Sequence, residues 1–273
     1  EVLKWIKKLP NPNCNFVNGG WIKTRATKTI QAINPANKNK LYKLSISSKS
    51  DVDKAVKSAK KAFPSWSKTS PYKKSKYLYA LARLIQKHSR FLAVLESIDN
   101  GKPIRETRDI DIPLVARHFY YHAGWAGKAS NNSIDPIGVV GSIAPWNYPL
   151  MIAAWKLAPA LATGNTIVLK PSEQTPLSLL FIVDILAEVF PKGVVNVIYG
   201  IGETVGSALI NNPHVQMISL TGDISTGKKV LEAASSTIKK THLELGGKAP
   251  VIVFDDADID LLIEGIKDFG YYN

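Results

Sequence analysis

The chain has 273 residues, 45% of them hydrophobic, and a formal net charge of +13. This length and composition suit one large or two ordinary domains with a sizeable core, and they exclude a largely disordered chain. No apolar run reaches the ~18 residues that a membrane-spanning helix needs, and no apolar segment of a secretory signal follows the basic N-terminus. The single cysteine, Cys14, excludes an internal disulfide. We therefore expect a cytoplasmic protein without a membrane partner.

The excess of basic residues, 35 Lys and Arg against 22 Asp and Glu, is also found in proteins that bind nucleic acids. However, the lysines occur in short, scattered groups such as Lys60-Lys61 and Lys239-Lys240, not in one stripe with interleaved aromatic residues. Solvated faces explain this distribution better. We expect no nucleic-acid partner and keep a nucleic-acid-binding module as a competing hypothesis.

The sequence pattern of residues 1–126 predicts short strands followed by helices. The segment from Phe16 to Ile22 has a glycine turn between apolar residues, which is typical of a hairpin. A helix is expected to begin after Ser50 as its N-cap and to end at Pro64. A longer helix is expected from Ser70-Pro71, because proline suits the first helical turn, and another amphipathic stretch covers Ile112 to Ala126.

Beyond Gly138 short β-rich runs alternate with helical runs. The expected strands are Val139–Ala144, Thr166–Leu169, Val194–Ile198, Met217–Leu220 and Val251–Phe254, and the expected helices are Met151–Leu161, Leu177–Val189, Glu203–Ile210 and Ser225–Ala233. This alternation predicts a parallel sheet covered on both faces, a doubly wound α/β fold. Because such sheets bind ligands at the carboxyl ends of their strands, the loops after the strands form the predicted site.

Polar residues occupy these loops. A strand-like run from Thr241 carries Glu244 to the glycine pair Gly246-Gly247, where a ligand can approach closely, so Glu244 could act as a general base. A solvated glutamate at a strand end is the alternative. Glu173 could accept hydrogen bonds from ribose hydroxyls, and the turn from Gly222 to Gly227 could seat a pyrophosphate at a helix N-terminus.

Four motifs follow one another along the chain: Ile143-Ala-Pro-Trp-Asn-Tyr-Pro-Leu150, Trp155-Lys-Leu-Ala-Pro-Ala-Leu-Ala-Thr-Gly-Asn165, Lys170-Pro-Ser-Glu-Gln-Thr-Pro176 and Leu243-Glu-Leu-Gly-Gly-Lys248. In order and spacing they resemble the NAD(P)-dependent aldehyde dehydrogenase superfamily, and the similarity covers essentially the whole chain. The segments from Lys248 to Asp258 and from Phe269 to Asn273 resemble its aminoaldehyde branch, such as γ-aminobutyraldehyde dehydrogenases.

The resemblance implies an aldehyde-dehydrogenase-like fold and the NAD-dependent oxidation of an aldehyde to the acid through a cysteine thioester. In that scheme Asn147 helps hold the oxyanion, and Glu244 activates the hydrolytic water. Lys156 resembles a lysine of a proton relay, with a surface or snorkelling lysine as the alternative. The cofactor positions implied are Ala144, Pro145, Trp146, Lys170, Ser172, Glu173, Gly202, Gly222, Asp223, Ser225, Gly227 and Leu245. A carboxylate at Glu173 should repel a 2′-phosphate, which favours NAD over NADP.

The same resemblance suggests the substrate. Tyr148 and Trp155 look like pocket aromatic residues that could attract a cationic amine, and Asp111 or Asp109 could supply an opposing charge. The expected substrate is therefore an aminoaldehyde such as 4-aminobutanal. No metal site is predicted.

Three features depart from the family pattern. The family's cysteine nucleophile follows the block that matches Phe269 to Asn273, so the 273 residues alone are expected to be inactive. Asp223 stands where the family usually has a small hydroxyl residue, and its charge should repel the pyrophosphate. Residues 127–137 are shorter than the family's oligomerisation hairpin.

We therefore expect three segments. Residues 1–126 form the N-terminal helices and the β lead-in, residues 127–137 a shortened oligomerisation hairpin, and residues 138–273 the Rossmann-like NAD-binding region, with the C-terminal catalytic domain outside this chain. The complete protein is expected to be a homo-oligomer. The competing hypothesis is a truncated, catalytically inactive protein that binds NAD or a partner.

Overall fold

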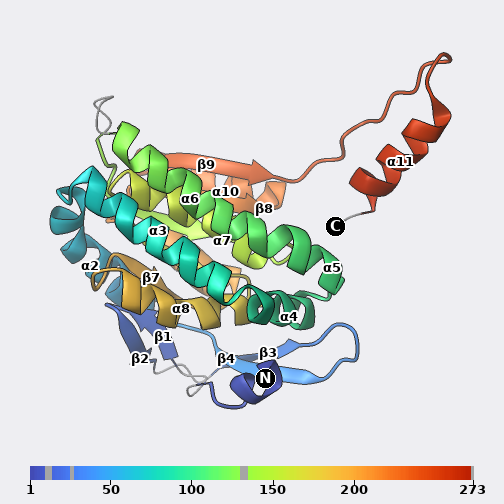
Figure 1. Ribbon diagram of the computed structural model, residues 1–273. Helices are drawn as coiled ribbons and strands as arrows, with labels where there is room; N and C mark the ends of the chain where they lie inside the picture. Colours follow the sequence, from blue (N-terminus) through green and yellow to red (C-terminus); the bar gives the residue numbers. More distant parts are fainter. Residues whose placement is uncertain (10–13, 25–27, 130–134, 272–273) are drawn as a thin grey trace.

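A computed structural model describes residues 1–9, 14–24, 28–129 and 135–271, and these residues form two sheets (Figure 1). The larger sheet has seven strands in the order β2-β1-β7-β6-β5-β8-β9, and β3 and β4 form a separate pair. The strands are β1 (Cys14–Val17), β2 (Gly20–Lys23), β3 (Thr29–Ile33), β4 (Lys40–Ser45), β5 (Val139–Ile143), β6 (Thr166–Lys170), β7 (Val195–Val197), β8 (Met217–Gly222) and β9 (Lys240–Leu245).

Helices precede and connect the parallel strands. Those before β5 are α1 (Val2–Ile6), α2 (Lys49–Ser67), α3 (Pro71–Lys87), α4 (Ser89–Asn100), α5 (Ile104–Glu106), the π-helical η1 (Thr107–Asp111) and α6 (Ile112–Ala129). Those after β5 are α7 (Pro149–Ala162), α8 (Leu177–Val189), the π-helical η3 (Gly202–Gly206), α9 (Ser207–Ile210), α10 (Ile224–Ser235) and α11 (Ile259–Gly270). No helix in the described ranges is both long enough and apolar enough to cross a bilayer.

The five strands β5 to β9 are parallel, and β5 lies between β6 and β8. The strand order therefore runs outward from β5 in both directions. This reversal between β5 and β8 is the topological switch point at which doubly wound sheets bind their ligands. The predicted α/β fold with a doubly wound, mainly parallel sheet is confirmed.

The hairpin predicted between Phe16 and Ile22 is also present. It consists of β1 and β2, and β1 pairs antiparallel with β7, so the hairpin extends one edge of the large sheet. Its turn residues Asn18 and Gly19 have φ values of 57° and 76°. Positive φ at both positions is what a tight two-residue hairpin turn requires, and glycine adopts it without steric cost.

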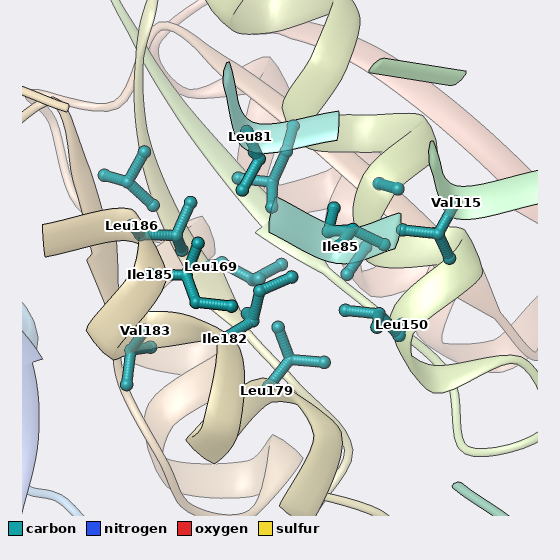
Figure 2. Close-up of a cluster of buried hydrophobic side chains, with 14 of the residues drawn as sticks. Leu81, Ile85, Val115, Leu150, Leu169, Leu179, Ile182, Val183, Ile185 and Leu186 are labelled. Carbon is teal, nitrogen blue, oxygen red and sulfur yellow. The ribbon is translucent and has the colours of Figure 1, made fainter. Parts of the chain in front are cut away.

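The core consists of two apolar clusters, one on each face of the large sheet. Alternate residues of β6 contribute to them: Ile167 and Leu169 belong to one cluster and Val168 to the other, because successive side chains of a strand point to opposite faces. Helices α3, α4, α6, α7 and α8 supply the first cluster, and α9, α10 and the first half of α2 supply the second. Figure 2 shows part of the first cluster, where side chains of α3, α6, α7, α8 and β6 meet.

The boundaries of α2 correct two predictions. Ser48, not Ser50, is the N-cap, because its hydroxyl accepts from the Asp51 N–H while the Asp51 carboxylate accepts from the Ser48 N–H. Pro64 lies inside α2 and does not end it. The following turn buries Trp66, which is 1% exposed, so tertiary packing outweighs the helix-breaking tendency of the proline.

Later helices differ less from prediction. α3 begins at Pro71 with Ser70 as its N-cap, as predicted. α6 begins at Ile112 as expected but continues a helical stretch that starts at Ile104, and it extends to Ala129. The shortened hairpin predicted over residues 127–137 stays a prediction, because residues 130–134 lie outside the described part of the chain.

The strand predicted over Val251–Phe254 is wrong, since β9 is the last strand among the described residues. The segment leaves the body after β9 and leads to α11, which stands apart from the rest of the molecule (Figure 1). No residue from Gly246 to Tyr271 is buried. β-branched and aromatic residues form a strand only beside a neighbouring strand, and the described part of the chain has no strand beyond β9 to pair with this run.

Candidate cofactor and catalytic site

The loops after the parallel strands lie next to one another at one edge of the sheet. Ile143 at the end of β5 pairs with Lys170 at the end of β6, and Thr221 of β8 pairs with Glu244 of β9. The strand ends are therefore adjacent, as predicted. Most residues predicted to bind a cofactor or to take part in catalysis lie on these loops, at the adjoining strand ends or in the first turns of the helices that follow.

Hydrogen bonds to its backbone hold the loop after β5, residues 144–148. The side-chain amide of Asn100, at the end of α4, donates to the carbonyl oxygens of Trp146 at 2.6 Å and Asn147 at 3.3 Å. The Thr175 hydroxyl also donates to the Trp146 carbonyl, at 3.1 Å. These bonds fix the backbone that carries the half-buried Asn147, as a preorganised oxyanion donor requires.

Two buried carboxylates of α4 cap the helices α7 and α8. The Glu96 Oε1 atom accepts from the Leu150 N–H at 3.2 Å, and the Asp99 Oδ2 atom accepts from the Leu177 N–H at 2.7 Å. Burial raises the pKa of Glu96 to about 7 and the pKa of Asp99 well above its usual value. α4 thus positions the first turns of both helices that follow the loops after β5 and β6.

A buried ion pair lies beside Tyr148. The Lys102 ammonium is 2.6 Å from an Asp111 carboxylate oxygen and 3.7 Å from the centre of the Tyr148 ring. Both charged side chains are buried. Asp111, predicted to oppose a cationic substrate, is therefore paired with a cation of the chain itself, and that cation also covers one face of Tyr148.

Lys170 and Glu173 form an ion pair at the end of β6. Their side-chain nitrogen and oxygen atoms are 2.9 Å apart, and the ammonium also donates to the Pro171 carbonyl at 3.0 Å. Ser172, between them, is buried and its hydroxyl accepts from the Gln174 N–H at 3.2 Å. The Lys170 side chain is 4% exposed and that of Glu173 29%, so Glu173 is the part that a ligand can reach.

Asp223 is the N-cap of α10. Its carboxylate accepts from the Thr226 N–H at 2.9 Å and from the Thr226 hydroxyl at 2.7 Å. Hydrogen bonds from Ser225 and Thr226 lower the pKa of Asp223, so the exposed carboxylate is ionised at neutral pH. The helix N-terminus predicted to seat a pyrophosphate therefore carries a negative charge.

Glycines shape the space around β9. A Cβ atom at Gly227 would lie 2.6 Å from the Leu245 side chain, so these two predicted cofactor residues pack directly against each other. Gly246 and Gly247 would place a Cβ in open space, and neither has a positive φ. The pair leaves room beside Glu244 without forming a left-handed turn.

A cavity of about 620 Å³ lies between η3, α9 and α10, beside the end of β5. Its lining includes Ile143, Gly202, Thr226 and Val230. A Cβ atom at Gly202 would meet nothing within 4 Å, so the glycine leaves this wall open. The cavity adjoins the switch point, where a doubly wound sheet binds its ligand.

Lys156 is buried together with its ammonium group, so the alternative of a surface or snorkelling lysine is wrong. Its ammonium donates to the Ser219 hydroxyl at 3.0 Å, and that hydroxyl is 3.0 Å from the His242 Nδ1 atom. The His242 Nε2 atom is 3.5 Å from a carboxylate oxygen of Glu244. Burial lowers the pKa of Lys156 to about 8, with Glu244 acting in the opposite direction. Two side chains thus connect Lys156 with Glu244.

The sequence profile of the aldehyde dehydrogenase family matches residues 21–273. The chain belongs to this family. DhaS of Bacillus subtilis strain 168, which is assigned to the aldehyde dehydrogenases, is 44% identical to it, and the match covers 94% of this chain and 55% of DhaS.

Solved structures of other family members have the same fold. The NAD+ complex of an aldehyde dehydrogenase from Bacillus cereus is 38% identical, with a TM-score of 0.89, over 96% of this chain and 56% of that one. Betaine aldehyde dehydrogenase from Staphylococcus aureus in complex with NAD+ is 37% identical, with a TM-score of 0.92, over 99% of this chain and 56% of that one. The chain therefore spans about half the length of these aldehyde dehydrogenases.

The remaining predicted residues of this aldehyde dehydrogenase chain lie in the loop after β5, in α7 and between the end of β8 and the first turn of α10. Ala144 is buried and donates its N–H to the Lys170 carbonyl at 3.0 Å. Trp146 is 55% exposed, and Trp155 is 44% exposed and packs edge-on against the His118 ring. The half-buried positions include Pro145, Tyr148 and Gly222, and the exposed ones include Ser225 and Asp223.

Sequence reasoning missed Asn100, Thr175, Ser219 and His242. A signal was available for His242, which precedes Glu244 by two residues in a strand and therefore shares its face. Asn100 gave no such signal, because its contacts join residues 46 and 47 positions apart.

Cys14 does not belong to this site. It begins β1, which is five strand positions from β9 in the sheet, or roughly 24 Å at ~4.8 Å between neighbouring strands. Burial also raises the pKa of its thiol. An aldehyde carbonyl held next to Glu244 is therefore out of its reach. In the described part of this aldehyde dehydrogenase chain, no group of three or more His, Cys, Asp or Glu residues could hold a metal ion.

Proposed function

We propose that this chain supplies the NAD-binding region, the oxyanion amide and the general base of an NAD-dependent aldehyde dehydrogenase. The observation that carries the proposal is that Asn147, the Lys170–Glu173 pair and Glu244 meet at one sheet edge, next to the cavity at the switch point. The NAD+ complexes of the relatives from Bacillus cereus and Staphylococcus aureus support this cofactor.

The described residues fit a dinucleotide. Ile143 and Val230 of the cavity offer apolar contacts to an adenine ring, and the Glu173 carboxylate can accept hydrogen bonds from ribose hydroxyls. The N-terminus of α10 offers backbone N–H groups to a pyrophosphate, opposed by the charge of Asp223. The charge of Glu173 disfavours a 2′-phosphate, so we propose NAD over NADP. When bound, NAD accepts a hydride from the substrate.

Two side chains of the site have chemical roles. The Asn147 amide can donate to the oxyanion that forms when a thiolate attacks the aldehyde carbon. Glu244, exposed at the end of β9, can take a proton from the water that hydrolyses the thioester. The thiolate must come from a cysteine that these 273 residues do not include, because Cys14 is too distant.

Calorimetric titration of the folded 273-residue chain with NAD and with NADP tests the cofactor proposal. We expect NAD to bind about tenfold more tightly, a difference of ~1.4 kcal/mol. Glu173→Gln should reduce the difference in affinity between NAD and NADP, because it removes the charge that repels the 2′-phosphate. Glu188→Gln, at an exposed position of α8, is the matched control and should leave both affinities unchanged. Absence of binding to a chain whose circular dichroism shows a folded state would contradict the proposal.

The catalytic roles are tested in a form of the protein that carries the nucleophilic cysteine. Glu244→Gln should lower the steady-state rate about 100-fold or more while the first turnover of NADH formation persists, because only the hydrolytic water needs the base. Rapid-mixing absorbance measurements separate the two phases. Unchanged steady-state turnover would remove Glu244 from the mechanism.

We further propose an aminoaldehyde as the substrate, supported by Trp155, whose exposed ring could attract a cationic amine. Tyr148 and Asp111 support it less, since Lys102 already contacts both. The test compares kcat/KM for 4-aminobutanal and for butanal, with Trp155→Leu as the variant. A preference for butanal, or a preference for the amine that the variant retains, would contradict this specificity.

Two further expectations remain proposals. A homo-oligomer is supported by the family resemblance, and light scattering coupled to size-exclusion chromatography of the cysteine-containing form tests it. A cytoplasmic location is supported by the sequence, with its single cysteine, and microscopy of a tagged protein tests it.

A further inference from the structure

The contacts between Lys156 and Glu244 form a continuous series from the core to the sheet edge. Ser219 of β8 and His242 of β9 are register partners, and His242 and Glu244 are two residues apart on the same face of β9. Lys156 approaches the Ser219 hydroxyl from α7. Within the described ranges, the side chains of Lys156, Ser219 and His242 form no other hydrogen bond or ion pair.

When the lysine is charged, its hydrogen bond to Ser219 has a fixed direction, and the other two contacts can continue in the same direction. An ammonium group only donates, so the Ser219 oxygen accepts from Lys156, and its own proton is then available to the His242 Nδ1 atom. In the arrangement in which Ser219 donates to it, the His242 Nδ1 atom is unprotonated, which leaves the proton of the neutral ring on Nε2, facing Glu244. All donors in this arrangement therefore point from Lys156 toward Glu244.

We propose that Ser219 and His242 form a proton path between Glu244 and Lys156, an inference that rests on the proposed general-base role of Glu244. Lys156 lies at the buried end of this path, and Glu244 lies at its exposed end.

The transfer balances when the lysine starts as a neutral amine. Glu244, protonated by the hydrolytic water, gives its proton to His242 Nε2, and the Nδ1 proton passes to the Ser219 oxygen. The original Ser219 proton moves to Lys156, which becomes an ammonium group. Each atom then has the protonation described above for the charged lysine, and Glu244 is again a carboxylate. No bond other than those to the moving protons changes.

The surroundings of the path carry few competing groups. Ser142 of β5 is the register partner of Ser219 on the other side of β8, and its buried hydroxyl has no hydrogen-bond partner in the described chain. Glu244 is the charged group that acts on the pKa of Lys156, which burial lowers to about 8. The neutral amine that the transfer requires is therefore accessible at mildly alkaline pH.

Nitrogen NMR of the 273-residue chain tests the path without any catalysis. The chain has five histidines, and His242→Gln identifies the signals of His242. At pH 7 we expect the neutral His242 ring to carry its proton on Nε2. Its Nδ1 signal should shift as the pH rises through about 8, and Lys156→Met should abolish this shift. A proton on Nδ1, or a shift that persists in Lys156→Met, would overturn the path.

The kinetic test uses the form that carries the nucleophilic cysteine. Ser219→Ala and His242→Val should each slow thioester hydrolysis about 10-fold or more, with the first turnover of NADH formation unchanged. Ser219→Thr should restore the rate because it retains a hydroxyl, and Ser142→Ala is the matched control. If both variants hydrolyse the thioester at the original rate after a normal first turnover, the path is wrong. If the unsubstituted protein forms no NADH, the proposed function is wrong. The NMR result then still shows whether the hydrogen bonds between Lys156, Ser219 and His242 are present.

Discussion

At Asp223 the carboxylate that caps α10 stands where a cofactor pyrophosphate is expected. Sequence reasoning predicted repulsion from the residue type alone. The structure adds that hydrogen bonds from Ser225 and Thr226 keep the carboxylate ionised and hold it at the helix N-terminus. The same side chain therefore stabilises α10 and opposes an anion there.

Asp223→Ser separates these two effects, because serine retains the cap and removes the charge. We expect NAD affinity to rise about fivefold at low salt, the equivalent of ~1 kcal/mol for charges ~4 Å apart in water. Calorimetry measures the affinity. Asp258→Ser is the matched control, since it changes the same residue type at the N-cap of α11, away from the site. Equal or weaker binding would mean that the Asp223 carboxylate lies away from the phosphates.

Lys102 and Asp111 form the buried ion pair beside Tyr148. Asp111→Asn should lower the free energy of unfolding by about 3–5 kcal/mol, because it removes the carboxylate that forms an ion pair with the buried Lys102 ammonium. Urea denaturation measures this loss. Asp109→Asn, at an exposed acid two positions earlier, should leave stability unchanged. Similar stabilities for both variants would show that water reaches Lys102 in the folded state.

The sequence was sufficient for the residues of contiguous motifs and insufficient for the contacts between motifs. Asn147, Lys170 and Glu244 could be placed on one edge because parallel strands end together. The partner of Asp111 could not be predicted, because the pairing with Lys102 depends on how η1 folds back on the turn after α4. The burial of Lys156 could not be predicted either, since it depends on how α7 packs on the sheet.

At the scale of elements, α4 positions the site through three side chains, although the sequence reasoning did not identify this helix. Its last turns cap α7 and α8 through Glu96 and Asp99 and hold the loop of Asn147 through Asn100.

Glu96 makes stability depend on pH. Burial raises its pKa from 4.5 to about 7, so between these values the folded state binds more protons than the unfolded state. The contribution of Glu96 to the free energy of unfolding is therefore fully present below pH 4.5 and is lost as the pH rises through about 7. The total loss is roughly 3 kcal/mol. Glu96→Gln should remove this part of the dependence in urea denaturation at pH 5 and 7.5.

The control for this measurement is Glu188→Gln, which changes an exposed glutamate of α8 and should retain the original pH dependence. Asp99 is also buried with a raised pKa, so the Glu96→Gln variant should keep part of the dependence of stability on pH. If the free energy of unfolding changes between pH 5 and 7.5 by as much in Glu96→Gln as in the unsubstituted chain, Glu96 is already ionised in the folded state at pH 5.

At the scale of the whole molecule, the sequence predicted the doubly wound sheet because strand-like and helical runs alternate at a spacing that only parallel connections satisfy. It failed at Val251–Phe254, where local preference favours a strand but the described residues contain no neighbouring strand that pairs with it. The chain therefore divides into a packed body that ends with β9 and an arm, residues 246–271, without a buried residue.

This division predicts how the chain responds to a protease. Local opening costs least where no side chain is buried, so trypsin should cut first after Lys248, in the segment between β9 and α11. Mass spectrometry of the early products identifies the cut. A chain that ends at Lys248 should then melt at the same temperature as the full 273 residues, because the body loses no buried contact. A first cut within α2 to α8, or a lower melting temperature, would mean that the arm packs on the body in solution and stabilises it.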